Sequence, residues 1–352
     1  GCVALTLLLC FGIFLRVNNL QIPTGRSPDE TNYTAQAQRL LREGSAGLRG
    51  IAEEYQRDPA ARLAGPPTRA GYLWALAATM RLTGRTDETA GAMLSCAASI
   101  GTMLLVALIG IRFFPPWATV FALLFLAIYP AELELARRSW SDALVGLLGL
   151  AVAYCAMEIT RDSARRFWHA AFLIVGSVGI VVKEFGAVTF ALCALWVVGL
   201  LIVRRQWRDA GFVIIGGLAG ASLSLLYLVQ AVGGLDALIA IVADWRGAHV
   251  ANQYAIEFQS GPPWLLFRAL YALSAHTILF SAYGMLIALG SILPRSSRKR
   301  NAPAQEGESR PPYRILPEVA WLALFCLALL TIPLLLTNWL NLRYVSAVFG
   351  PL

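Results

Sequence analysis

The feature that most constrains this chain is a series of long apolar segments with very few charged residues. A helix needs about 20 apolar residues to cross a bilayer, and no alternating pattern typical of barrel strands is present. The backbone must therefore form its hydrogen bonds within helices. We predict an all-α polytopic membrane protein with about nine visible transmembrane helices, at roughly 1–15, 89–111, 116–131, 142–157, 167–182, 186–203, 210–230, 265–293 and 316–337.

The composition supports a membrane protein over a soluble or nucleic-acid-binding one. Charged residues make up 14% of the 352 residues, and the mean hydropathy is +0.61, whereas soluble domains carry about 25% charged residues. The net charge of +8 comes largely from short basic loops between apolar segments, so we expect no nucleic-acid partner. The six cysteines lie in apolar segments without metal-ligand spacing.

The basic loops also predict the orientation in the membrane. Arginines and lysines cluster at 161–166, at 204–208 and in 294–315. We interpret the last of these, 294–315, as a basic cytoplasmic linker. Because cytoplasmic loops carry an excess of basic residues, the segment 16–88 is expected on the outer side. The first apolar run, 1–15, is shorter than a full span, and the last residues, 349–352, do not look like a natural C-terminus. Both termini are therefore expected to be truncated.

The outer segment 16–88 is expected to carry helices that lie on the membrane. Residues 70–83 are apolar but contain Arg81 and are too short to span, which favours an interfacial helix from about 69 to 82. A second helix is predicted from 28 to about 42. The later outer segment 231–264 is expected to be a loop whose charges are mostly solvated.

The sequence Ser27-Pro28-Asp29-Glu30 directly follows the first apolar segment and allows two interpretations. It is a good helix start, with Ser27 as N-cap, proline at the first helical position and Glu30 closing a capping box. It also places two carboxylates at a membrane surface, where either can act in catalysis. The two interpretations are compatible, because a capped helix start is a rigid mount for a functional acid.

Further charges are expected on the same outer side, and each has two interpretations. Arg137, Arg138 and Asp142 surround the start of a span, where they either cap the helix or face the same cavity as Asp29. Lys183 precedes Glu184, and adjacent helical residues pair poorly. We therefore expect Lys183 to be free to bind an anion such as phosphate. Arg343 and Tyr344 follow the last predicted span. Arg343 either reaches the lipid headgroups or binds a phosphate.

These motifs, in this order, resemble the GT-C membrane glycosyltransferases, most of all the family 39 group of protein O-mannosyltransferases and lipid A aminoarabinose transferases. The resemblance rests on Pro28-Asp29-Glu30 with Tyr33, on Pro66-Pro67 with Gly71-Tyr72-Leu73, on Arg138 to Asp142, on Lys183, and on Arg343-Tyr344. It covers nearly the whole chain. The chain departs from the family's pattern at Thr68-Arg69, where members often have a tyrosine or a basic residue after the proline pair.

The resemblance implies an inverting hexosyl- or pentosyltransferase of the inner or plasma membrane. It would move a sugar from a polyprenyl-phosphate donor to an acceptor hydroxyl of a protein, lipid or glycan at the outer face. Asp29 would act as general base with Glu30 orienting it, and Tyr33 is a further candidate. Arg138, Lys183 and Arg343 would bind the leaving phosphate. Asp142 would position the acceptor or, with Asp29, hold a divalent cation; no cofactor is certain.

Two other functions remain open at this stage. A transporter or flippase of a lipid-linked or small polar substrate would also carry charges in its membrane segments. However, the charges here cluster on one side, and no internal repeat of the kind found in transporters is visible. An inactive relative that binds a lipid-linked sugar as a scaffold is the third interpretation.

Overall fold

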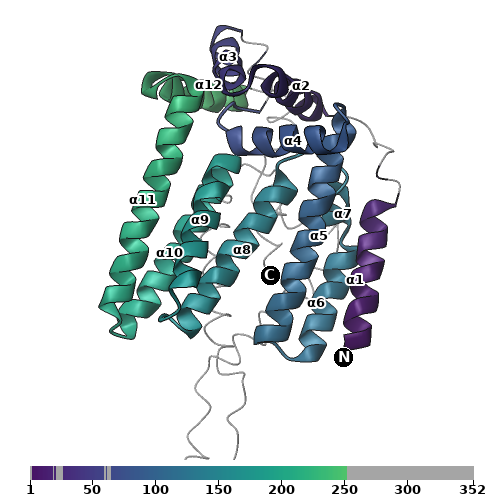
Figure 1. Cartoon of the computed structure of the whole chain (residues 1–352), viewed down its shortest axis with the longest axis vertical. Helices are drawn as coiled ribbons and strands as arrows, with labels where there is room; N and C mark the ends of the chain where they lie inside the picture. Colours follow the sequence, from purple (N-terminus) through teal and green to yellow (C-terminus); the bar gives the residue numbers. More distant parts are fainter. Residues whose placement is uncertain (1, 19, 21–26, 59–60, 62–64, 252–352) are drawn as a thin grey trace, which may run out of the picture.

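The computed structural model describes residues 2–18, 20, 27–58, 61 and 65–251, and within these ranges it contains twelve α-helices and no strand (Figure 1). Seven of the helices are apolar and together form a bundle. They are α1 (Cys2–Val17), α5 (Glu88–Phe113), α6 (Pro116–Ile128), α8 (Asp142–Arg161), α9 (Arg166–Val182), α10 (Glu184–Val203) and α11 (Trp207–Val232).

These seven helices coincide with the seven spans predicted before residue 252. Among the described residues, α5, α8, α10 and α11 are long and apolar enough to cross a membrane, and α1, α6 and α9 are shorter apolar helices. The chain is therefore an integral membrane protein. The predicted spans 265–293 and 316–337, together with the predicted linker 294–315, lie outside the described residues.

The remaining helices cover one end of this bundle, which we call the capped end. The helices α2 (Pro28–Glu43), α3 (Ser45–Arg57), α4 (Ala70–Thr83) and α12 (Leu235–Ala251) lie across it, and the short α7 (Pro130–Leu135) precedes α8 there (Figure 1). The predicted helices at 28–42 and 69–82 correspond to α2 and α4.

The prediction of a loop at 231–264 was wrong for its first half, because α12 occupies 235–251. Asp236 and Asp244 suggested a solvated segment, but Leu238 and Ile241 are buried in the cluster that also contains residues of α3.

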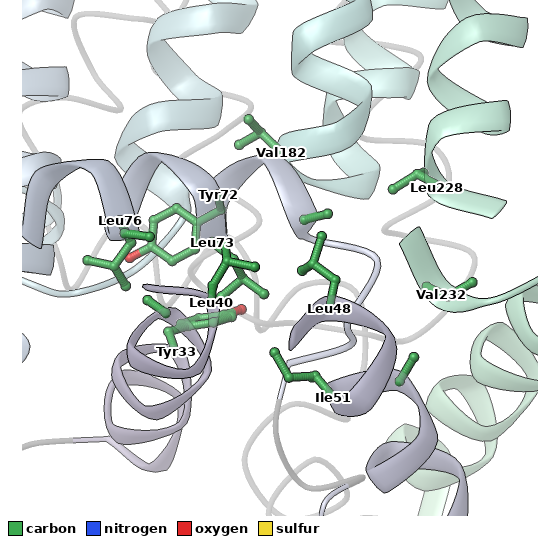
Figure 2. Packing of buried hydrophobic residues seen from close by; sticks show 14 of the residues in the cluster. Tyr33, Leu40, Leu48, Ile51, Tyr72, Leu73, Leu76, Val182, Leu228 and Val232 are labelled. Carbon is green, nitrogen blue, oxygen red and sulfur yellow. The ribbon is translucent and has the colours of Figure 1, made fainter. Parts of the chain in front are cut away.

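Buried aromatic and aliphatic side chains hold α2 and α4 together. Tyr33 of α2 and Tyr72 of α4 are 2% and 0% exposed, and their ring centroids lie 5.0 Å apart in an edge-to-face contact. Leu40, Leu73 and Leu76 complete this layer (Figure 2). Burying each large apolar side chain contributes roughly 1.5–3 kcal/mol, so this packing is a substantial part of what holds α2 against α4.

A glycine allows α4 to lie close against the end of α9. A Cβ atom added at Gly71 would stand 3.0 Å from the backbone carbonyl of Val181, which is tighter than a normal contact. The helix α4 ends at Gly84 in the left-handed conformation, with φ of 69°, as is common for a glycine that terminates a helix. The close approach places the first turn of α4 beside the turn that joins α9 to α10.

Ion pairs fix the opposite end of the bundle. Arg112 of α5 pairs with the buried Glu158 of α8, and Arg166 of α9 pairs with Asp209 of α11 at 2.9 Å. The basic loops at 161–166 and 204–208 are at this end, where α8 ends and α9 begins and where α10 ends and α11 begins (Figure 1). The basic loops 161–166 and 204–208 therefore lie at the end of the bundle opposite to α2 and α4.

Candidate functional site

The carboxylate of Glu30 joins the start of α2 to the loop that follows α7. The side chain is 3% exposed. Its Oε2 accepts hydrogen bonds from the backbone N–H of Ser27 at 2.8 Å and from Nη1 of Arg138 at 3.0 Å, and its Oε1 accepts one from the backbone N–H of Ser139 at 3.0 Å. Glu30 thus closes the predicted capping box and also pairs with a distant arginine.

Two contacts within its own segment orient Arg138, and a third contact joins the loop to the N-cap of α2. Nε of Arg138 donates to Oε1 of Glu134 at 2.8 Å, and its guanidinium lies 4.9 Å from the ring centre of Trp140. The indole N–H of Trp140 donates in turn to the hydroxyl of Ser27 at 3.0 Å. Because the guanidinium is stacked and bonded on two sides, Arg138 is held in one orientation beside Glu30.

Asp29 lies in the first turn of α2 and is partly exposed. It is close to Tyr33, one turn further along the same helix. Burial raises the pKa of Tyr33 to about 12; the positive charge of Arg69 opposes this rise, and the negative charge of Asp29 adds to it. Asp29 therefore contributes a negative charge on the same side of α2 as the buried Tyr33.

Asp142 and Lys183 form a buried ion pair. Asp142 begins α8, and Lys183 lies in the turn between α9 and α10; Nζ donates to Oδ1 at 2.7 Å. The two side chains are 10% and 5% exposed, respectively. Burial lowers the pKa of Lys183, and the nearby Asp142 carboxylate partly restores it. The expectation that Lys183 is free of an acidic partner was wrong, because the fold brings Asp142, 41 positions earlier, against its ammonium.

Sequence reasoning did not place Arg69 and Glu184 in the site. Arg69 directly precedes α4, is 9% exposed and donates from Nε to Oε1 of Glu184 at 3.3 Å. Its Nη1 donates to the hydroxyl of Tyr33, and the hydroxyl of Thr68 also lies 3.3 Å from Oε1 of Glu184. The available signal was a charged residue placed just after the proline pair and just before an apolar helix.

Tyr72 connects these contacts across the site. Its hydroxyl lies 3.5 Å from the hydroxyl of Ser139, and its ring packs on Tyr33. Burial raises the pKa of Tyr72; the hydrogen bond to Ser139 opposes this rise, and the negative charges of Asp142 and Glu30 add to it. The acids of α2 and α8 are therefore both near one tyrosine of α4.

Charged groups from four separate parts of the chain thus converge at the capped end. We call this group the charged cluster; it consists of Asp29, Glu30, Arg69, Arg138, Asp142, Lys183 and Glu184. The structure places Arg137 elsewhere, because its Nη2 donates to the backbone carbonyl of Leu15 in α1 at 2.7 Å. Arg343 and Tyr344 lie outside the described residues.

The described ranges contain no group of three or more histidine, cysteine, aspartate or glutamate side chains that could hold a metal ion. One oxygen of Asp142 faces the ammonium of Lys183. The divalent cation shared by Asp29 and Asp142 therefore stays a prediction.

Comparison with known proteins identifies the fold and the family. Residues 66–255 match the family model for dolichyl-phosphate-mannose-protein mannosyltransferase; this range includes every member of the charged cluster except Asp29 and Glu30. A solved structure, ArnT from Cupriavidus metallidurans in the apo state, is similar with a TM-score of 0.54 and 15% sequence identity. The alignment covers 98% of this chain and 58% of that one.

No curated protein matches the chain. The likeness to ArnT shows a GT-C fold, as the sequence predicted, although the chain spans little more than half the length of that structure. The family model covers more than half of the 352 residues. The chain therefore belongs to the dolichyl-phosphate-mannose-protein mannosyltransferase family.

Proposed function

We propose that the chain is an inverting glycosyltransferase that moves a sugar from a polyprenyl-phosphate donor to a hydroxyl group of a protein, lipid or glycan. The observation that carries the proposal is the convergence of the charged cluster at the capped end, in a chain of this family. Such a site offers carboxylates for proton transfer and cations for a leaving phosphate within one region. Family membership also favours a transferase over a transporter.

Asp29 is the residue that we assign as general base. The assignment follows the family resemblance of Pro28-Asp29-Glu30 and the position of Asp29 in the first turn of α2. Asp29 is partly exposed, and it is fixed in place because its neighbour Glu30 anchors the helix start. A base on a rigid helix terminus meets the geometric requirement for proton abstraction.

The chemistry needs one proton transfer and one bond exchange. The acceptor oxygen attacks the anomeric carbon from the face opposite the phosphate, and the bond between that carbon and the phosphate oxygen breaks. The proton of the acceptor hydroxyl moves to Asp29, while the electron pair of the broken bond leaves with the polyprenyl phosphate. The configuration at the anomeric carbon is inverted.

Cations of the cluster would stabilise the charge on the leaving phosphate. Lys183 and Arg138 are mostly shielded from solvent, with side chains 5% and 15% exposed, and charge stabilisation is stronger where water is excluded. Arg343 would add a third cation. The apolar helices around the site suit a donor whose polyprenyl chain lies in lipid. Asp142 would position the acceptor.

The capped end is proposed to face the periplasm or the exterior of an inner or plasma membrane. The support is the position of the basic loops 161–166 and 204–208 at the opposite end, because basic loops favour the cytoplasmic side. Acceptors and the sugar of the donor would then meet at the outer face.

The test is a transfer assay in membranes that contain the chain. Polyprenyl-phosphate donors carrying a labelled hexose or pentose are supplied, and label is followed into protein, lipid and glycan fractions. The proposal predicts new glycosidic linkages that are absent from matched membranes without the chain and absent when a nucleotide sugar is the sole donor. Movement of the labelled donor across the membrane without any new linkage would support the transporter instead.

A further inference from the structure

The ion pair between Asp142 and Lys183 conflicts with a simple view of donor binding. The ammonium of Lys183 is buried and already faces a carboxylate oxygen at 2.7 Å. A phosphate that binds this ammonium would come within a few ångströms of the Asp142 carboxylate. Two like charges that are close together and shielded from water repel each other strongly. The phosphate and Asp142 are therefore competitors for one ammonium group.

The start of α8 offers Asp142 an alternative to this pairing. Asp142 lies in the first turn of the helix, where backbone N–H groups and the helix dipole stabilise a negative charge. A carboxylate that loses its ammonium partner at this position keeps a favourable environment. Lys183, in contrast, is on a flexible four-carbon side chain in the turn between two helices, so its ammonium can move between two anions.

We propose that Asp142 holds Lys183 in the donor-free site and releases it to the phosphate of the lipid donor. The inference rests on the proposed function and adds a binding order to it. After the exchange, the Asp142 carboxylate is available to an acceptor hydroxyl, so the acceptor subsite is completed only when the donor is bound. Toward the donor, Asp142 is a positioning residue, since it acts on the phosphate through Lys183.

The experiment measures binding of polyprenyl monophosphate to the purified full chain in detergent micelles by calorimetry. Asp142→Asn keeps the shape of the side chain and removes the competing charge. It should bind polyprenyl monophosphate more tightly than wild type, on the order of tenfold, which is within the usual range of coupling between linked binding events. Adding Lys183→Met to Asp142→Asn should abolish the gain.

Two controls separate the exchange from general electrostatic effects. Asp209→Asn removes the acid of a more exposed ion pair at the opposite end of the bundle, where Asp209 lies 2.9 Å from Arg166, and it should leave binding unchanged. The uncharged polyprenol and inorganic phosphate are titrated in parallel. Asp142→Asn could increase the affinity for inorganic phosphate as much as the affinity for polyprenyl monophosphate. That result would indicate a free-phosphate site and overturn the assignment to the lipid donor.

The outcomes distinguish failure of the inference from failure of the proposed function. Equal or weaker binding by Asp142→Asn, with wild type binding normally, would overturn the exchange and leave the donor assignment intact. Absence of binding by wild type and Asp142→Asn alike would remove the donor assignment and with it the proposed function. If Asp142→Asn does not fold, Asp142→Ser replaces it, because the smaller side chain leaves room for a water molecule beside the ammonium.

Discussion

Replacing Glu30 by glutamine tests whether this residue holds the charged cluster together. The substitution removes the negative charge that faces Arg138. It replaces one of the two carboxylate oxygens by an amide NH₂ group and keeps the other as an amide oxygen. If the amide oxygen keeps its bond with the N–H of Ser139, the NH₂ group faces the N–H of Ser27 and Nη1 of Arg138, which are both donors. An unsatisfied buried donor costs about 1–3 kcal/mol, and breaking a buried ion pair costs about 3–5 kcal/mol.

The costs of the unsatisfied donor and of the broken ion pair do not add in full, because Arg138 keeps its ion pair with Glu134 and its stacking on Trp140. We expect Glu30→Gln to lower the free energy of unfolding by about 3 kcal/mol, the lower limit of the ion-pair range. The assay is thermal unfolding of the purified protein at fixed detergent and protein concentration. Transfer activity is measured in the same samples below the unfolding midpoint, and it should fall because Asp29 loses its fixed position.

Glu134→Gln is the matched control, since Glu134 pairs with the same guanidinium at 2.8 Å but its side chain is 46% exposed. Exposed ion pairs contribute about 0–1 kcal/mol, so this variant should unfold close to wild type. If the two variants lose equal stability, or if Glu30→Gln unfolds like wild type, then burial of the Glu30 contacts does not stabilise the site as argued.

Two further predictions concern α2 and α4. Since the pKa of the buried Tyr33 is raised from 10.0 to about 12, wild type should lose about 2–3 kcal/mol of stability from this group as pH rises from about 10 to 12. Tyr33→Phe should lack this part of the loss in alkaline unfolding titrations, and an equally steep decline would show that Tyr33 titrates normally. Gly71→Ala places a methyl group 3.0 Å from the backbone of Val181; it should lower the unfolding midpoint through about 1–3 kcal/mol of overpacking, and an unchanged midpoint would mean that α4 does not need this close approach.

Much of the fold could be predicted from hydropathy alone. Each apolar span before residue 252 reappears as a helix, because lipid leaves the backbone no other way to form its hydrogen bonds. The capping box at Glu30 was also predictable, since it depends on contacts three residues apart. The helix α12 was missed because its scattered acidic residues masked the few buried apolar side chains that pack it against the capped end.

The pairing within the charged cluster could not be predicted in the same way. Asp142 and Lys183 are 41 positions apart, and Arg69 and Glu184 are 115 apart. Which cation meets which acid depends on how α4 lies across the ends of α8 and α9, and no local pattern encodes that arrangement. Arg137 and Arg138 show the same limit, because adjacent arginines with equal sequence signals contact different helices.

We propose above that Asp29 removes the acceptor proton at a site assembled at the capped end. The most direct test of this proposal is the rate of sugar transfer from a labelled polyprenyl-phosphate donor by Asp29→Asn, measured with donor binding in the same preparation. Asp87→Asn, at the exposed N-cap of α5, is the matched control at the same end. We expect Asp29→Asn to bind donor like wild type but to transfer sugar about 10²–10⁴-fold more slowly, while Asp87→Asn is unaffected. An Asp29→Asn variant that transfers sugar at the wild-type rate would contradict the proposal.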